Sequence, residues 1–461
     1  MHRRNAAMAL SALILSACSF DPGARREGSF LAHECPSDLV APKVRCGSVS
    51  VPENRADPAG RRIALNVVVF DALEPGASRS AQFDLEGGPG FAVTESAAFY
   101  ASDGEAYRRR RAVVLADMRG TGGSGALRCR ALEDYARADP GAPLYPVELV
   151  RKCRDALDGT ADLRQYTTAA ASEDIEAVRE ALGYERIDLN ALSYGTTLAL
   201  RYVADHPDRV RTAVLMGAVP AKAMPPAHHA LAADDGLKRL IDSCAHDAAC
   251  ATQYPDLHGD VDRARSRLGP EEGAVFFERM RALLYLPATS RQVPALLHAA
   301  AAGRAIPPAA ARQRVFADGL YLAITCSESL AVMNVADAIA EADATPFGSY
   351  RLARQRDACA QWPRAAPDPD LMREPSSDVP ILLLSGALDP VAPTAWSVEL
   401  AKAFPNGRLV VVPEGAHVMD GLDGLDTCLD GMILRFVDTR SAAAIDDTCV
   451  SRMRAGPFTT L

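Results

Sequence analysis

From residue 62 onward, the sequence alternates short apolar runs with segments of helical periodicity. The apolar runs are rich in β-branched residues and have the length of single strands, whereas the segment 172–183 places Ile175, Val178 and Leu182 on one helical face. Such alternation is typical of the α/β class, in which helices cover a mostly parallel sheet. The expected strands are residues 63–70, 81–85, 112–116, 186–191, 211–216, 380–384 and 408–412.

The alternation is interrupted once, between about residues 221 and 377. There the β-rich runs vanish and alanine-rich helical segments replace them, which predicts a helical cap inserted after the strand at 211–216. The chain is therefore divided into a sheet-forming core at 35–220, the cap at 221–377 and a second part of the core at 378–461. Within the core, the helix over 172–183 is expected to begin at Ser172, its N-cap, and to end at Gly183.

The first 34 residues have the features of a targeting segment. Arg3 and Arg4 precede an apolar run at 6–17 that is too short to span a bilayer, as in a secretory signal; a buried helix is the alternative. Residues 15–18 resemble a bacterial lipobox, so Cys18 is expected to be acylated after removal of 1–17, with 18–34 as a short tether. These features predict an exported lipoprotein, anchored to a membrane and facing the periplasm or the cell surface.

The cysteine content agrees with export to an oxidising compartment. Eleven cysteines less Cys18 leave ten, and none has the CxxC spacing of a zinc or redox site, so no metal is expected. Sequence leaves the connectivity open. Pairing in sequence order would give five disulfides: Cys35–Cys46, Cys129–Cys153, Cys244–Cys250, Cys326–Cys359 and Cys428–Cys449.

Ser193 stands at a turn between an expected strand and an expected helix, in the stretch LNALSYGTT. A nucleophile elbow holds its serine in a strained turn and needs small residues two positions before and after it, because the strand and the helix pass close together. Gly195 meets the second requirement, and Ala191 adds one methyl group to the first. The pattern indicates a catalytic serine; a serine in an ordinary turn is the alternative.

Two residues that could activate Ser193 follow it at strand ends, first an acid and then a histidine, which is the order this fold uses. Asp389 lies just past the apolar run ILLLSG, and His417 lies just past LVVVP. A serine hydroxyl attacks once a histidine accepts its proton and an acid orients that histidine. Taken singly, these residues are a turn aspartate and a surface histidine. Their shared placement at the carboxyl edge of the sheet predicts a catalytic triad with Ser193.

A glycine-rich loop before Ser193 is the candidate oxyanion hole. The stretch EGGPGF follows the strand at 81–85, where glycines let backbone amides approach a substrate oxygen; a plain turn is the alternative. The expected donors are the amides of Gly88 and Tyr194. A second loop, DMRGTGG, carries Asp117 and Arg119, which are expected to support the scaffold by pairing with each other or with turn backbone.

Taken together, these motifs resemble those of the α/β-hydrolase family of proline iminopeptidases and tripeptidyl aminopeptidases. The motifs are GGPG from Gly87, DMRGTGGS from Asp117, SYGT from Ser193, SGALDPVAP around Asp389 and PEGAHVM around His417. The region 359–449 is similar to the C-terminal region of the tripeptidyl aminopeptidases. The resemblance implies an α/β-hydrolase fold and the removal of residues from peptide N-termini through an acyl-enzyme, without metal or organic cofactor. By position, Ser193 would be the nucleophile, His417 the general base and Asp389 its orienting acid.

The sequence departs from the family at two positions. Many members have Gly where Ala191 stands, and the iminopeptidase branch often has His where Glu86 stands, which leaves the substrate preference open. An exopeptidase must also bind a free α-ammonium, for which a cap carboxylate is the natural partner, since a desolvated charge needs pairing. Glu328, close to Cys326, is the candidate for this substrate-binding role; a solvated or structural glutamate is the alternative.

The leading interpretation is an exported serine hydrolase that acts as an aminopeptidase on short peptides. An esterase or small-amide hydrolase on the same fold is the main alternative, and a hydrolase-fold binding lipoprotein without chemistry is another. The formal net charge of −9 becomes −11 once Arg3 and Arg4 are removed, and no basic patch offsets it, which argues against a nucleic-acid partner. Sequence leaves open the length of the substrate, the membrane and the oligomeric state.

Overall fold

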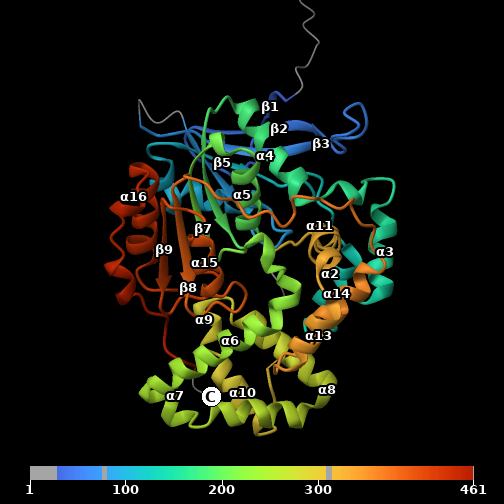
Figure 1. Ribbon diagram of the computed structural model, residues 1–461, viewed down its shortest axis with the longest axis vertical. Coiled ribbons are helices and arrows are strands. Elements are labelled where there is room, and N and C mark those ends of the chain that lie inside the picture. Colours follow the sequence, from blue (N-terminus) through green and yellow to red (C-terminus); the bar gives the residue numbers. More distant parts are fainter. Residues whose placement is uncertain (1–27, 75–79, 308–313, 460–461) are drawn as a thin grey trace, which may run out of the picture.

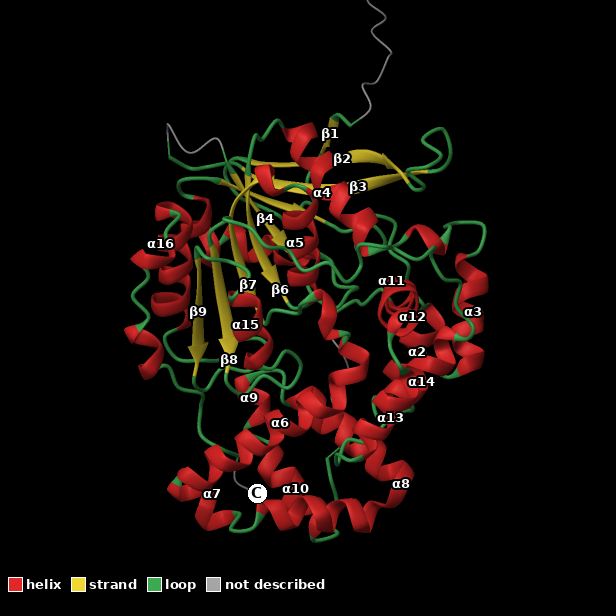
Figure 2. Cartoon of the chain, viewed as in Figure 1, coloured by secondary structure: helices red, strands yellow, loops and turns green. Residues whose placement is uncertain are grey.

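A mostly parallel sheet of nine strands forms the centre of the described residues, which are 28–74, 80–307 and 314–459 of the computed structural model (Figures 1 and 2). The strand order is β1-β2-β3-β5-β4-β6-β7-β8-β9, antiparallel from β1 to β5 and parallel from β5 to β9. The strands are β1 (Phe30–His33), β2 (Val44–Pro52), β3 (Arg62–Phe70), β4 (Ala81–Leu85), β5 (Ala112–Ala116), β6 (Ile187–Leu192), β7 (Val210–Met216), β8 (Ile381–Gly386) and β9 (Gly407–Val412).

The seven predicted strands are confirmed as β3 to β9, with ends that shift by at most two residues. The other two strands lie outside the prediction. β1 falls within residues 18–34, so the prediction of a tether over that whole segment is wrong at its end. The sequence of β2 is not an apolar run, because one side of the strand carries small and polar residues while Val49 and Val51 are buried on the other side.

Alternate residues of the strands face two separate cores, one on each side of the sheet. In β8, Ile381 and Leu383 pack in the core that includes α4 and α5, whereas Leu382 and Leu384 pack in the core that includes α16. Because both faces are covered, β8 is an unbroken apolar run. The helices of these two layers are α4 (Thr168–Leu182), α5 (Tyr194–Asp205), α2 (Arg130–Ala138), α3 (Val147–Leu157) and α15 (Thr394–Ala401) on one face, and α1 (Ala97–Ala101) and α16 (Gly431–Thr439) on the other.

Helix α4 begins earlier than its sequence predicts. The hydroxyl of Thr167 accepts a hydrogen bond from the amide three residues on, at 3.2 Å, so Thr167 is the N-cap and the prediction of Ser172 is wrong. Ser172 instead lies buried inside the helix and donates to Asp205 at 3.0 Å. Thr and Ser are both good N-cap residues, so the packing of the turn between Thr167 and Ser172 determines where the helix begins. The predicted end at Gly183 is confirmed, since this glycine has a left-handed φ of 76°.

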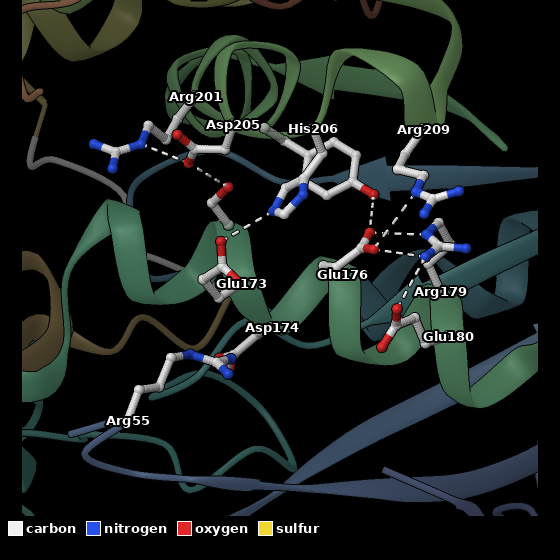
Figure 3. A network of polar contacts seen from close by, with 12 residues as sticks. Arg55, Glu173, Asp174, Glu176, Arg179, Glu180, Arg201, Asp205, His206 and Arg209 are labelled. Carbon is white, nitrogen blue, oxygen red and sulfur yellow. Dashed lines mark hydrogen bonds and ion pairs between the residues drawn. The ribbon is translucent and has the colours of Figure 1, made fainter. Parts of the chain in front are cut away.

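A network of polar contacts fastens α4 to α5 (Figure 3). Glu176 accepts a hydrogen bond from Arg179 of its own helix at 2.5 Å and from the hydroxyl of Tyr202 in α5 at 2.7 Å. Glu173 lies 3.0 Å from the ring of His206, just past the end of α5. Because Ser193 immediately precedes α5, these contacts fix the helix behind the candidate nucleophile.

The loop after β5 ties the scaffold together, with partners that differ in part from the expected ones. Asp117 accepts hydrogen bonds from the amides of Thr94 and Gly123, at 3.0 and 2.9 Å. Arg119 is buried and donates to Asp174 of α4 at 2.6 Å rather than to Asp117. The ion pair thus joins the loop to α4, a connection between residues 55 positions apart that no local pattern marks.

The residues predicted as one cap, 221–377, fall into two groups. Helices α6, α7, α8 and α10 share a core of their own, which includes Leu237, Phe277 and Leu297. Helices α11 and α14 instead lie beside α2 and α3 and enter the sheet core through residues such as Leu320 and Ala358 (Figure 1). Amphipathic periodicity predicts that one face of a helix is buried, but it does not predict which core that face packs into. The helices of the region are α6 (Pro225–His246), α7 (Ala248–Gln253), α8 (Leu257–Leu283), α9 (Pro287–Ser290), α10 (Val293–Ala301), α11 (Asp318–Ile324), α12 (Leu330–Val332), α13 (Val335–Asp343) and α14 (Tyr350–Cys359).

All five predicted disulfides are confirmed, with Cα atoms 5.0–5.8 Å apart. The Cys326–Cys359 bond ties a π-helical turn after α11, Thr325–Ser329, to the end of α14. Within the described residues, no single helix has both the length and the apolar character to cross a membrane. One bent pair, Asp318–Val332 with Val335–Asp343, meets those two criteria only when its members are taken together.

Candidate active site

Ser193 occupies the tight turn between β6 and α5. Its φ of 57° and ψ of −125° are values that non-glycine residues rarely adopt, so the backbone is strained there. Gly195 lies so close to β4 that a Cβ would sit 2.2 Å from the carbonyl oxygen of Leu85. Ala191 is buried, and its methyl group packs in the sheet core. The turn therefore accepts alanine at the first position and requires glycine at the second.

The structure brings Ser193, His417 and Asp389 into one hydrogen-bonded chain. The Oγ of Ser193 lies 2.7 Å from Nε2 of His417, and Nδ1 of His417 lies 2.8 Å from Oδ2 of Asp389. When the imidazole carries its proton on Nδ1 and donates it to Asp389, Nε2 accepts the hydroxyl proton of Ser193. These residues are distant in sequence and meet because β6, β8 and β9 end at the same edge of the sheet.

The acid and the histidine are each held from more than one side. The Oδ1 of Asp389 accepts hydrogen bonds from the amides of Val391 and Ala392, both at 2.8 Å. The side chain of His417 is 2% exposed, and the ring of Tyr285 packs against it edge-on, with ring centres 5.3 Å apart. The carboxylate is fixed by bonds to both oxygens, and it fixes the imidazole in turn.

The glycine loop after β4 lies directly against Ser193. A Cβ on Gly87 would sit 2.9 Å from the Cβ of Ser193, and the amide of Gly87 donates to the carboxylate of Glu86 at 2.9 Å. Gly88 lines the same cavity as Ser193 and Tyr194. The amide of Tyr194 is the first of α5, so it has no acceptor within the helix. Both predicted oxyanion donors thus belong to residues beside the serine.

Ser193 and His417 line a cavity of about 670 Å³, a volume typical of ligand sites, while Asp389 is buried behind the histidine. The wall of this cavity is formed by the carboxyl edge of the sheet together with helices and loops of the region 221–377. No local pattern singles out the wall residues of that region, because packing between distant segments places them there. They include His229, Arg281, Tyr285, Arg314, Phe316, Tyr321 and Arg351.

Glu328, the candidate partner for a substrate ammonium, lies in the wall of this cavity. Its carboxylate accepts hydrogen bonds from the amide and the hydroxyl of Thr168, both at 2.6 Å, and that hydroxyl lies 2.8 Å from the hydroxyl of Tyr194. Burial raises the pKa of Glu328 to about 7, because the charged carboxylate loses its solvation by water.

Glu328 also differs from the other two carboxylates of the cavity wall. Glu86 pairs with Arg314 at 3.1 Å, and Asp370 pairs with Arg373 at 3.8 Å. No cationic side chain in the described part of the chain forms an ion pair with Glu328. Among the carboxylates of the cavity wall, Glu328 is therefore the one that has no ion-pair partner in the described ranges.

The close contact at Gly195 gives a test of the elbow. We expect Gly195→Ala to slow the reaction of Ser193 by about 100-fold or more, because the new Cβ must displace either the serine or the carbonyl of Leu85. The measurement is the rate of labelling by a fluorophosphonate, which reacts with activated serines. Ala191→Gly is the matched control and should label at a rate close to that of the wild type. Equal rates for Gly195→Ala and the wild type would contradict the constraint.

Comparison with known proteins agrees with this architecture. A family model described as the alpha/beta hydrolase fold matches residues 85–243, and one described as TAP-like protein matches residues 344–449. The tripeptidyl aminopeptidase of Streptomyces coelicolor is 25% identical and aligns over 92% of this chain and 86% of that protein. Serine protease Hip1 of Mycobacterium tuberculosis is 28% identical over 222 residues, which cover 44% of this chain and 42% of that protein.

Among solved structures, the proline iminopeptidase of Mycobacterium smegmatis covers 86% of this chain and 99% of its own, at 17% identity and a TM-score of 0.40, a likeness too low to support a conclusion. The two family models match different parts of the chain, and the alignments to the tripeptidyl aminopeptidases extend over both. The chain is therefore a serine hydrolase that is similar over residues 85–243 to the alpha/beta hydrolase fold and over residues 344–449 to TAP-like proteins.

Proposed function

We propose that this chain is an aminopeptidase of the tripeptidyl-aminopeptidase or proline-iminopeptidase type, acting on short peptides. One observation carries the proposal: a single cavity is lined by Ser193 and His417 of the bonded chain and by Glu328, a carboxylate without an ion-pair partner among the described residues. An aminopeptidase needs a nucleophile for the scissile carbonyl and an anion for the α-ammonium. The tripeptidyl aminopeptidases that align with most of the chain support the same activity.

In the proposed reaction, the Oγ of Ser193 attacks the scissile carbonyl carbon while Nε2 of His417 accepts the hydroxyl proton. The amides of Gly88 and Tyr194 would donate to the oxyanion. His417 then gives its proton to the departing amine, which leaves an ester between Ser193 and the N-terminal fragment. Water, losing a proton to His417, attacks this ester and releases the fragment with a new carboxylate.

The length of the released fragment follows from the position of the ammonium site. Because the N-terminal fragment is the acyl part, the group that binds its ammonium sets how many residues lie between the N-terminus and Ser193. Glu328 reaches the residue after Ser193 through two hydroxyls, those of Thr168 and Tyr194. Glu328 would therefore bind the ammonium on the acyl side of the cavity.

The activity is tested with arylamides that carry one or three residues and a free N-terminus, beside N-acetylated forms and short acyl esters. We expect cleavage of a free-amine arylamide, and a loss of roughly 10⁶-fold in kcat in Ser193→Ala, because the nucleophile is gone. Ser451→Ala, at an exposed serine, is the matched control and should keep full activity.

Three outcomes of this experiment would contradict the proposal. Cleavage of esters alone, without gain from a free amine, would favour an esterase. Equal fluorophosphonate labelling of wild type and Ser193→Ala would remove Ser193 from the reaction. A wild type that neither labels nor cleaves would favour a binding lipoprotein.

The pKa of Glu328 gives the ammonium site a pH signature. With a pKa of about 7, Glu328 is mostly ionised at pH 7.5 and mostly protonated at pH 5.5, so KM for a free-amine arylamide should rise at least roughly tenfold as the pH falls. In Glu328→Gln, KM should be high at both pH values, since no charge is present at either. A Glu328→Gln protein that keeps the wild-type KM profile would refute this role.

We also propose that the protein is exported and anchored through acylated Cys18, which lies outside the described residues. Five disulfides support export, because such bonds persist in oxidising compartments. With the proposed peptidase activity and lipid anchor, the partners would be short peptides and a membrane surface, and no nucleic acid.

The anchor has a direct test. Cys18→Ala should move the protein from the membrane fraction to the soluble fraction after cell disruption, because the acylation site is gone. Wild-type protein fractionated in parallel is the reference. Retention of the variant on membranes would contradict lipid anchoring at Cys18.

A further inference from the structure

Two arginines in the cavity wall share one carboxylate. Arg281 of α8 donates to Glu278 at 2.7 Å, and Arg351 of α14 donates to the same carboxylate at 3.0 Å. The side chains of Arg281, Arg351 and Glu278 are only 8%, 17% and 16% exposed. The cluster thus holds two positive charges against one negative charge in a poorly solvated place. Despite burial, the two guanidinium groups hold the pKa of Glu278 far below its usual range.

The cluster lies close to the candidate triad. Nη1 of Arg281 donates to the hydroxyl of Tyr285 at 2.7 Å, and the guanidinium carbon lies 5.2 Å from the centre of the Tyr285 ring. The same ring packs on His417 at 5.3 Å between centres. One aromatic ring therefore separates the excess positive charge from the imidazole, a span that about three extended residues cover.

His229 lines the cavity between these two features, since Arg281, Arg351 and His417 all act on it electrostatically. Its Nδ1 is buried and has no hydrogen-bond partner among the described residues. Burial and the nearby guanidinium groups hold the pKa of His229 well below its usual range. A neutral His229 adds no positive charge, so the excess positive charge of this part of the wall comes from the arginines.

One nitrogen of Arg351 has no hydrogen-bond acceptor among the described residues. The bonds from Arg351 to Glu278 use Nε and Nη2, and no acceptor in the described ranges is bonded to its Nη1. A buried ion cluster with a net charge is costly unless a further group neutralises it. An ion pair that only joined α8 to α14 would need one arginine and one glutamate. The second arginine leaves a positive charge that faces the cavity.

We propose that Arg281 and Arg351 form a subsite for a carboxylate of the substrate, within a few residues of the scissile bond. Guanidinium groups bind carboxylates in paired, directional hydrogen bonds, which suits them to this task. The carboxylate is either the acidic side chain of a residue near the scissile bond or the C-terminal carboxylate of a short peptide. This inference rests on the proposed peptidase function and adds a substrate class to it.

The subsite is separate from Glu328. Glu328 is hydrogen-bonded to Thr168 at the start of α4, whereas Arg281 and Arg351 are hydrogen-bonded to Glu278 of α8. A short peptide carries an ammonium at one end and one or more carboxylates elsewhere. The cavity wall therefore offers a negative group and a positive group to one zwitterionic ligand.

The test uses peptide pairs that differ by one charge: Ala-Ala-Glu-arylamide against Ala-Ala-Gln-arylamide, and a tetra-alanine with a free C-terminus against its C-terminal amide. Turnover is measured with the wild type. Binding is measured by calorimetry on Ser193→Ala, which needs no reaction. In at least one pair we expect the carboxylate member to be favoured at least tenfold, in kcat/KM and in Kd, and the favoured pair identifies the source of the carboxylate.

In Arg351→Gln, combined with Ser193→Ala for binding, this ratio should fall to about one. In Arg351→Lys, which keeps the charge and loses the paired geometry, the ratio should be intermediate. Arg356→Gln, at an exposed arginine of the same helix, is the matched control and should keep the wild-type ratio. Should Arg351→Gln fail to fold, the ratios of Arg351→Lys and the wild type still decide.

Ratios near one in both pairs for the wild type, or ratios that Arg351→Gln and Arg351→Lys leave unchanged, would overturn the subsite. Cleavage of neutral substrates would then leave the peptidase function intact. Conversely, a carboxylate preference in binding without any cleavage would uphold the subsite and count against the proposed reaction.

Discussion

The site depends on close approaches at the carboxyl edge of the sheet that glycines allow because they carry no side chain. Gly195 meets a carbonyl of β4, Gly87 faces Ser193, and a Cβ on Gly217 would lie 3.0 Å from the ring of His417. These approaches let residues from separate loops come within hydrogen-bond distance. They also force Ser193 into a strained conformation, which persists because α5 is fixed by its contacts with α4.

The parts of this arrangement that could be predicted are local or depend on order along the chain. Buried strands appear as apolar runs, and an acid followed by a histidine at strand ends suggests the partners of Ser193. The rest depends on packing. In β2 the buried residues alternate with exposed ones, so no apolar run marks the strand. Thr167 and Ser172 are both suitable N-caps for α4. The ion pair of Arg119 with Asp174 joins segments that are distant in sequence. The cavity-wall residues of the region 221–377 carry no sequence pattern, because the cavity forms only when distant helices pack together.

The charged groups of the cavity come from this less predictable part, yet one covalent bond links two of them. Glu328 stands in the π-helical turn after α11, and Arg351 stands on α14. The Cys326–Cys359 disulfide joins these two elements. Its contribution is thus more than stability, because it limits how far the acidic and basic groups of the cavity can move apart. Glu328 could be predicted from the sequence because it lies close to Cys326, whereas no sequence feature predicted Arg351.

The position of β1 sets how the molecule would stand on a membrane. β1 lies at one end of the long axis, and α7, α8 and α10 lie at the other (Figure 1). Eleven residues separate Cys18 from Phe30, which reach at most about 40 Å when extended. A lipid on Cys18 would therefore hold the protein by the edge of its sheet. Helices α7, α8 and α10 would then stand at the end of the molecule away from the anchored edge.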